Sequence, residues 1–106
     1  MTLRHPTIEE LELEAVLHAL SDPQRLAIAV ALAVDTAPRR CGGFGLPVTK
    51  STLTHHFRVL REAGVIHQAE EGTSRLNRLR RGDLDARFPG LLDAILAAAP
   101  HAPVPA

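Results

Sequence analysis

The sequence predicts a small, mainly α-helical domain that carries one β-hairpin. Aromatic residues are scarce, with three Phe and no Tyr or Trp among 106 residues, so the core must be built from Leu, Ile, Val and Ala. Apolar residues recur with helical spacing over most of the chain. Between residues 65 and 80 the pattern changes to two short extended runs around Glu71-Gly72, a turn signal. The length fits a single domain, residues 1–106.

The helix at residues 49–63 has the clearest signals. Thr49 stands where a helix N-cap is expected, and Gly64 stands where a left-handed C-cap residue is expected. Its buried face follows the spacing i, i+4 and i+7: Leu53, Phe57 and Leu60. The opposite face carries four side chains that can hydrogen-bond, none of them acidic: Ser51, Thr52, His55 and Arg58. A helix with these two faces suits the DNA major groove, so we interpret it as a recognition helix.

Charge is unevenly distributed along the chain. Twelve basic residues balance twelve acidic ones, but Lys50 to Arg81 holds seven basic residues against three acidic ones. The predicted hairpin at 65–80 contributes Arg75 and Arg78, which makes it a basic wing beside the recognition helix. A set of ordinary solvated surface charges is the alternative interpretation.

The remaining elements complete an α-α-(short α)-α-β-β-α order. A first helix is predicted over 7–20, with Thr7 and Glu10 forming a capping box. A second helix begins at Pro23 after the capping residue Asp22 and runs to about Val34. Three glycines between 35 and 47 leave room only for a shortened helix or single turn around Cys41 to Leu46.

The first and last helices are predicted to form a dimer surface. The helix at 7–20 is apolar on two sides, which calls for a second partner beyond the domain's own core. The last element, 83–99, contains a short helical turn and then a helix from Pro89, whose apolar stripe is Leu91, Leu92, Ile95 and Leu96. Both carry more apolar surface than a domain this small readily covers, so a homodimer is expected.

Two stretches of the chain resemble the ArsR/SmtB family of regulators. They are S-D-P-Q-R-L-A-I from Ser21 and K-S-T-L-T-H-H-F-R-V-L-R-E-A-G-V-I from Lys50, followed by E-G-T and a short Arg/Leu strand. The resemblance covers roughly residues 11–96. It implies a winged helix-turn-helix homodimer that binds a palindromic operator in double-stranded DNA. It also implies DNA contacts at these positions of the recognition helix: Lys50, Ser51, Thr52, Thr54 and His55.

Many members of that family sense metals, but their ligand patterns fit this chain poorly. One class of metal site in the family uses a Cys-x-Cys pair before the recognition helix, and here only Cys41 lies in that region. Another class uses acidic and His ligands along the last helix. Here Asp83-x-Asp85 faintly resembles its start, but Leu96 and Ala99 occupy the positions where further ligands are needed. A transition metal such as Zn, Ni or Cu wants several N or S ligands in fixed geometry. The remaining candidates have no diagnostic spacing: Cys41, His5, His18, His67 and His101. Ordinary surface histidines with a lone thiol, or a metal-sensing partner protein, remain open alternatives.

Other functional classes have weaker support. The chain has no nucleotide-binding loop, no paired carboxylates in a plausible cleft and no nucleophile with a supporting His and acid, so an enzyme is not expected. A winged-helix module that binds protein is the alternative function. The sequence also lacks an apolar run at its start and a stretch of roughly 20 apolar residues, so a cytoplasmic protein without membrane contact is expected.

Overall fold

A computed structural model describes residues 3–100. Its elements follow the predicted order, with an added strand and a divided first and last helix. They are η1 (Ile8–Glu10), α1 (Leu13–Leu20), α2 (Pro23–Val34), β1 (Arg39–Arg40), η2 (Cys41–Phe44), α3 (Lys50–Ala63), β2 (Ile66–Glu71), β3 (Ser74–Leu79), α4 (Arg81–Arg87) and α5 (Leu91–Ala98), where η denotes a 3₁₀ helix. The predicted mainly α fold with a small hairpin is confirmed.

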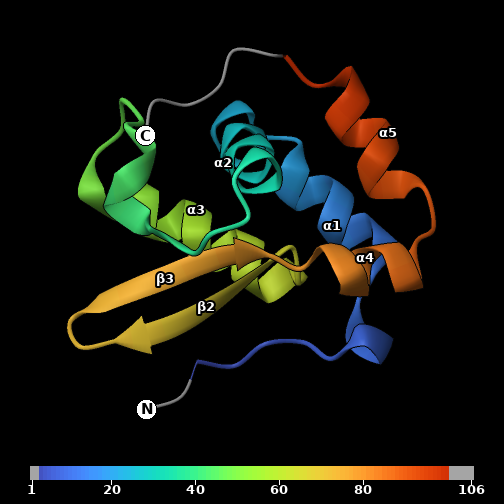
Figure 1. Cartoon of the computed structure of the whole chain (residues 1–106), viewed down its shortest axis with the longest axis horizontal. Helices are drawn as coiled ribbons and strands as arrows, with labels where there is room; N and C mark the ends of the chain where they lie inside the picture. Colours follow the sequence, from blue (N-terminus) through green and yellow to red (C-terminus); the bar gives the residue numbers. More distant parts are fainter. Residues whose placement is uncertain (1–2, 101–106) are drawn as a thin grey trace.

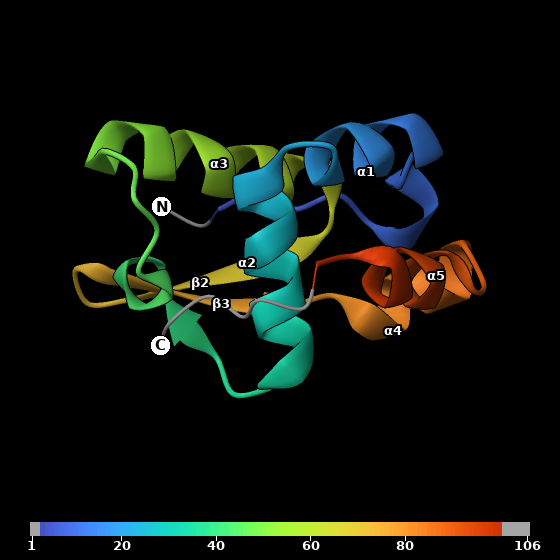
Figure 2. The same ribbon diagram turned by 90° about the horizontal axis from the view of Figure 1, so that it is seen from above.

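The wing and the outer helices lie at opposite ends of the molecule (Figure 1). The β2–β3 hairpin projects at one end, whereas α1, α4 and α5 gather at the other. Seen from above, α3 and α1 lie along one edge, and α2 runs across the middle of the molecule (Figure 2). No helix within residues 3–100 is both long and apolar enough to cross a membrane.

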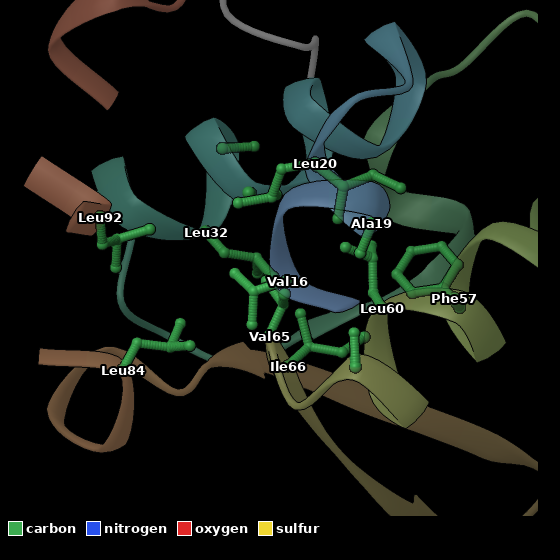
Figure 3. Close-up of a cluster of buried hydrophobic side chains, with 14 of the residues drawn as sticks. Val16, Ala19, Leu20, Leu32, Phe57, Leu60, Val65, Ile66, Leu84 and Leu92 are labelled. Atoms are coloured by element: carbon green, nitrogen blue, oxygen red, sulfur yellow. The ribbon is translucent and has the colours of Figure 1, made fainter. Parts of the chain in front are cut away.

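The core lies where α1, α2, α3 and the base of the hairpin meet (Figure 3). Phe44 from η2 is fully buried, and its ring centroid lies 5.4 Å from that of Phe57 on α3. Leu46 is half-buried at the edge of the core. Leu92 of α5 is only 2% exposed, so this part of the predicted dimer stripe belongs to the chain's own core.

The predicted first helix, 7–20, is wrong as one continuous helix. The capping box at Thr7 is present, with the Thr7 amide donating to Glu10 Oε1 at 2.9 Å, but it caps only the single turn η1. The backbone is extended at Leu11 and Glu12, and α1 then begins at Leu13. This break places Leu11 in the core at 1% exposure, where it packs over Gly64.

The last element, 83–99, is also divided. α4 begins at Arg81 and is a full helix of two turns, longer than the short turn that the sequence predicted. Gly90, with φ at 82°, separates it from α5 after Pro89. The later helix agrees with its prediction to within a few residues, since α5 ends at Ala98.

The sheet has a third strand that the sequence did not reveal. β1 pairs antiparallel with β3, which gives the order β1-β3-β2. The apolar residues Leu76 and Leu79 of β3 are only half-buried, whereas Asn77 is fully buried. Asn77 Nδ2 donates to the carbonyl of Arg39 at 2.9 Å, and Asn77 Oδ1 accepts from Gln68 Nε2 at 2.8 Å. A satisfied polar pair therefore joins the three strands.

Gly64 is the glycine that the fold most requires. Its φ is 85°, and a Cβ built there lies 2.0 Å from Leu11 Cδ2. We expect Gly64→Ala to lower the free energy of unfolding, measured by urea denaturation, by about 1–2 kcal/mol for the left-handed backbone. Overpacking against Leu11 adds about 1–3 kcal/mol.

Gly72→Ala is the matched control for this substitution. Gly72 also has a positive φ, at 61°, but a Cβ placed on it would have no other atom within 4 Å. It therefore tests the backbone effect without the clash. Equal losses of stability in the two variants would contradict the packing of Leu11 over Gly64.

Candidate nucleic-acid interface

Both ends of α3 are fixed by the residues that the sequence predicted. The Thr49 side chain accepts a hydrogen bond from the Thr52 amide at 3.2 Å, and Gly64 ends the helix in the left-handed conformation. The inner face is buried against the core: His56, Phe57, Leu60 and Ala63. Because this face is fixed, the helix presents a defined outer face.

All six predicted site residues on α3 are exposed: Lys50, Ser51, Thr52, Thr54, His55 and Arg58. Ser51, His55 and Arg58 follow the spacing i, i+4 and i+7, so they share the outward face. Lys50 and Thr54 lie on the flank next to the wing, where both border a groove. Thr52 lies on the other flank, and its hydroxyl accepts from Thr49 Oγ1 at 2.9 Å. The neighbour of His55, His56, is buried.

The two arginines predicted to contact DNA from the wing lie on opposite faces of the sheet. Arg75 and Arg78 are both exposed, but they differ in parity along β3 and therefore lie on opposite faces of the sheet. Arg75 borders the same groove as Lys50 and Thr54. Arg78 pairs with His67 and lies on the outer face beside Leu76. Only Arg75 therefore joins the recognition helix on one continuous surface.

An open groove of about 650 Å³ lies between η2, the start of α3 and the wing. Three basic residues border it, Arg40, Lys50 and Arg75, and we call it the basic groove. Its other lining residues are Cys41, Gly42, Gly43, Thr54, Phe57, Gln68, Thr73 and Ser74. Within residues 3–100 no acidic side chain lines it. A groove with this charge attracts an anionic chain such as a phosphate backbone.

Arg40 is the residue of this site that the sequence analysis missed. The pairing of β1 with β3, which aligns Arg40 with Leu76, brings it beside the wing. Its neighbour Arg39 is used internally, because its guanidinium packs 5.1 Å from the Phe44 ring and its carbonyl accepts from Asn77. The Arg39-Arg40 doublet was a visible basic signal, but its strand pairing was not.

Three other basic residues between Lys50 and Arg81 form hydrogen bonds or ion pairs within the chain. Arg61 Nη1 donates to Gln68 Oε1 at 2.6 Å. Arg80 donates to Asp83 Oδ2 at 2.9 Å and to the Pro6 carbonyl at 2.7 Å, and Arg81 pairs with Asp93. Burial lowers the pKa of Arg61, and the nearby charge of Arg75 lowers this pKa further. These contacts leave Lys50, Arg58 and Arg75, with Arg40, as the exposed basic residues around α3.

The candidate metal ligands do not gather in the described part of the chain. Residues 3–100 hold no group of three or more His, Cys, Asp or Glu side chains able to hold an ion. His5 and His67 stack at 4.4 Å, but His5 Nε2 accepts from the Gln68 amide and its Nδ1 faces the Leu3 carbonyl. Cys41 contacts the side-chain amides of Asn77 and Gln68. His18 is exposed elsewhere, and His101 lies outside the described residues. A single chain therefore offers no fitting donor set within residues 3–100.

The fold and the site define a winged helix-turn-helix domain with a basic surface for nucleic acid. The chain is 33% identical over 82 residues to the uncharacterized HTH-type transcriptional regulator YceK of Bacillus subtilis (strain 168), a match that covers 76% of this chain and 82% of that protein. The chain belongs to this family of HTH-type transcriptional regulators. It is therefore a DNA-binding regulator and not an enzyme, as predicted.

A solved structure supports the same fold. The crystal structure of an ArsR family transcriptional regulator superimposes with a TM-score of 0.62 at 22% identity, covering 80% of this chain and 82% of that one. The predicted resemblance to ArsR regulators is confirmed. No family model matches the chain.

Proposed function

We propose that this regulator binds a palindromic DNA operator as a homodimer, with α3 of each subunit in the major groove. The observation that carries the proposal is the joining of the exposed face of α3 to the basic groove. Ser51, His55 and Arg58 offer hydrogen bonds to base edges, while Arg40, Lys50 and Arg75 lie beside them to bind phosphates. One surface thus supplies both base readout and backbone contacts.

The dimer is assigned to the end of the molecule away from the wing. Two large apolar side chains of α1 are exposed there, Leu13 at 40% and Leu17 at 45%. They are four residues apart and so share one face of the helix. On α5, Ile95 and Leu96 are half-buried, and α5 lies at the same end (Figures 1 and 2). A twofold axis through this end pairs two copies of α3, as a palindromic operator requires.

Salt titration tests the proposal against a protein-binding module. The protein is titrated into duplex DNA from its own upstream region, with fluorescence anisotropy as the readout, over a range of salt concentrations. DNA binding predicts that affinity falls steeply as salt rises, because each phosphate contact releases counterions. A salt-independent association, or no binding at low salt, supports the protein-binding alternative.

Base readout is expected to depend on the exposed side of α3, with His55 on the outward face and Thr52 on its flank. We expect His55→Ala or Thr52→Ala to reduce the preference for operator over random DNA by ~1–3 kcal/mol, the loss typical of a mismatched base pair. Affinity for random DNA is expected to change little, since base-edge contacts supply sequence preference while phosphate contacts supply most of the non-specific affinity. Competition gel shifts with both DNAs measure the preference. An unchanged ratio for both variants would contradict base contacts from this face.

Metal response is a separate question for the same regulator. Residues 3–100 of one chain gather no donor set. Metal sensing would therefore draw on donors from both subunits, on residues outside this range, or on a metal-sensing partner protein. Repeating the DNA titration with Zn²⁺, Ni²⁺ and Cu⁺ tests whether the protein itself responds to a metal. A shift in DNA affinity with one ion supports a metal-responsive regulator, and equal curves favour either sensing through a partner protein or no metal response.

A further inference from the structure

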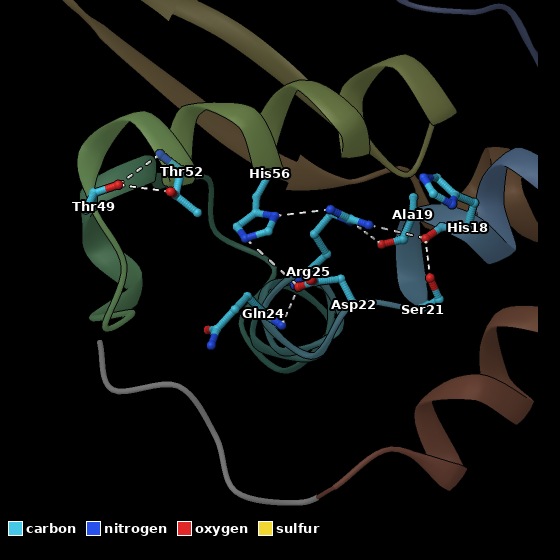
Figure 4. A network of polar contacts seen from close by, with 9 residues as sticks. All are labelled: His18, Ala19, Ser21, Asp22, Gln24, Arg25, Thr49, Thr52 and His56. Carbon is cyan, nitrogen blue, oxygen red and sulfur yellow. Dashed lines mark hydrogen bonds and ion pairs between the residues drawn. The ribbon is translucent and has the colours of Figure 1, made fainter.

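A buried arginine connects the recognition helix to the two helices before it (Figure 4). Arg25 of α2 donates through Nε to the Ala19 carbonyl at 2.7 Å and through Nη2 to the His18 carbonyl at 3.4 Å, at the end of α1. Its Nη1 lies 3.1 Å from Nδ1 of His56 on α3. Arg25 and His56 are each only 7% exposed. This is a buried polar contact between α2 and α3.

The contact determines which nitrogen of His56 carries a proton. An arginine side chain can only donate, so His56 Nδ1 must accept, and the proton of the neutral ring is on Nε2. Nε2 lies 4.0 Å from Asp22 Oδ1. That oxygen already caps α2, accepting from the amides of Gln24 at 2.8 Å and Arg25 at 3.2 Å. Asp22 therefore accepts its hydrogen bonds from the α2 amides, and its carboxylate lies too far from the His56 ring for a close hydrogen bond.

A second proton on His56 would disrupt this arrangement. It would place an N–H at Nδ1 directly against the donating Arg25 and would bring two positive charges together. The charged groups facing the ring are Asp22 and Arg25 from α2 and His55 from its own helix, while α1 contributes only carbonyls to Arg25. Burial lowers the pKa of His56, Asp22 opposes this, and Arg25 and His55 lower the pKa further. Burial is the largest of these effects, and the net result is a lowered pKa for His56.

We propose that Arg25 and His56 are positioning residues for the recognition helix, and that only neutral His56 holds α3 in its DNA-binding orientation. The proposal rests on the proposed function. His56 is the immediate neighbour of His55 and lies one turn from Thr52, so a shift of α3 at His56 displaces the outward face that reads DNA. Acidification would then release the regulator from its operator.

The test compares operator affinity from about pH 7.5 to about pH 5, the range in which histidines titrate. His56→Asn keeps an oxygen near the position of Nδ1 to accept from Arg25, but it cannot take up a proton. We expect wild-type affinity to fall about tenfold or more as the pH drops below 6.5, the ordinary pKa of the ring, while the variant loses much less. Identical pH profiles for the two proteins would overturn the proposal.

His55→Gln is the matched control on the same helix. His55 is exposed on the outward face, so His55→Gln is expected to keep the wild-type fall in affinity at low pH, measured relative to its own affinity at neutral pH. Burial is also the main cause that lowers the pKa of His5 and of His67, and both therefore weaken the fold as the pH falls. His5 and His67 are present in wild type and in both variants. The difference between the pH profiles of wild type and His56→Asn therefore reports the effect of His56 alone.

A measurement without DNA separates this proposal from the proposed function. Ring ¹⁵N shifts should identify the Nε2–H form of His56 at neutral pH. Amide shifts along α3 should move with the titration of that ring and should lose this movement in His56→Asn. An Nδ1–H form, or α3 amides that do not follow His56, would overturn the proposal even if the protein binds DNA. Failure to bind DNA at neutral pH would instead contradict the proposed function alone.

Discussion

Replacing Leu13 and Leu17 together with aspartate is expected to give a monomer that has lost most of its affinity for the operator. Both side chains are exposed, at 40% and 45%, so the substitution places charge on the proposed interface without entering the core. Two linked subunits bind two half-sites with an effective concentration that a monomer lacks. The expected loss of affinity is therefore about a hundredfold or more.

Light scattering gives the mass, and anisotropy with operator DNA gives the affinity. Val34→Asp is the matched control, because Val34 is 77% exposed at the end of α2 and so also places a charge on an exposed apolar position. It should leave both mass and affinity unchanged. Leu92→Asp would not test the interface, since Leu92 lies in the core and its replacement disrupts folding. A dimer that persists in the Leu13/Leu17 variant would place the interface elsewhere.

The second large effect is expected from removing the charges of the basic groove. In the triple variant Arg40→Ala, Lys50→Ala and Arg75→Ala, each lost phosphate contact should make the salt slope shallower by about 0.9, or by about 5 for the two subunits together. Affinity should fall by about 10³-fold or more for operator and random DNA alike, since phosphate contacts carry no sequence information. All three side chains are exposed, so the fold should be retained.

Arg75→Ala and Arg78→Ala form a matched pair for the path of the DNA. They change the same residue type on the same strand, but on opposite faces of the sheet. If the backbone passes through the basic groove, Arg75→Ala should cause the larger loss. A larger loss for Arg78→Ala would move the DNA to the outer face of the wing. No change for either variant would contradict a wing contact.

The parts of the fold that were predictable have local causes. The bounds of α3 followed from the cap Thr49 and from Gly64, and those of α2 followed from Asp22 and Pro23. In each case the decisive hydrogen bond joins residues within one turn of each other. The break at Leu11 has no such local cause. It depends on the space above Gly64, which is more than 50 residues away in the chain.

The candidate site was predictable only in part for the same reason. Helical spacing correctly placed Ser51, His55 and Arg58 on the exposed face of α3. It did not reveal that Arg40 lies beside the wing, since a pairing of β1 with β3 brings it there. That pairing depends on Asn77, a buried amide that looked like an ordinary polar residue of an exposed hairpin.

Backbone amide shifts, recorded as operator DNA is added to the 11.5 kDa chain, test the central claim most directly. The account predicts that the largest changes map to the first three turns of α3, to Arg40 and to Arg75, while Val34 and the buried side of α5 remain unaffected. Changes confined to α1 and α5, with α3 and the basic groove unperturbed, would contradict it.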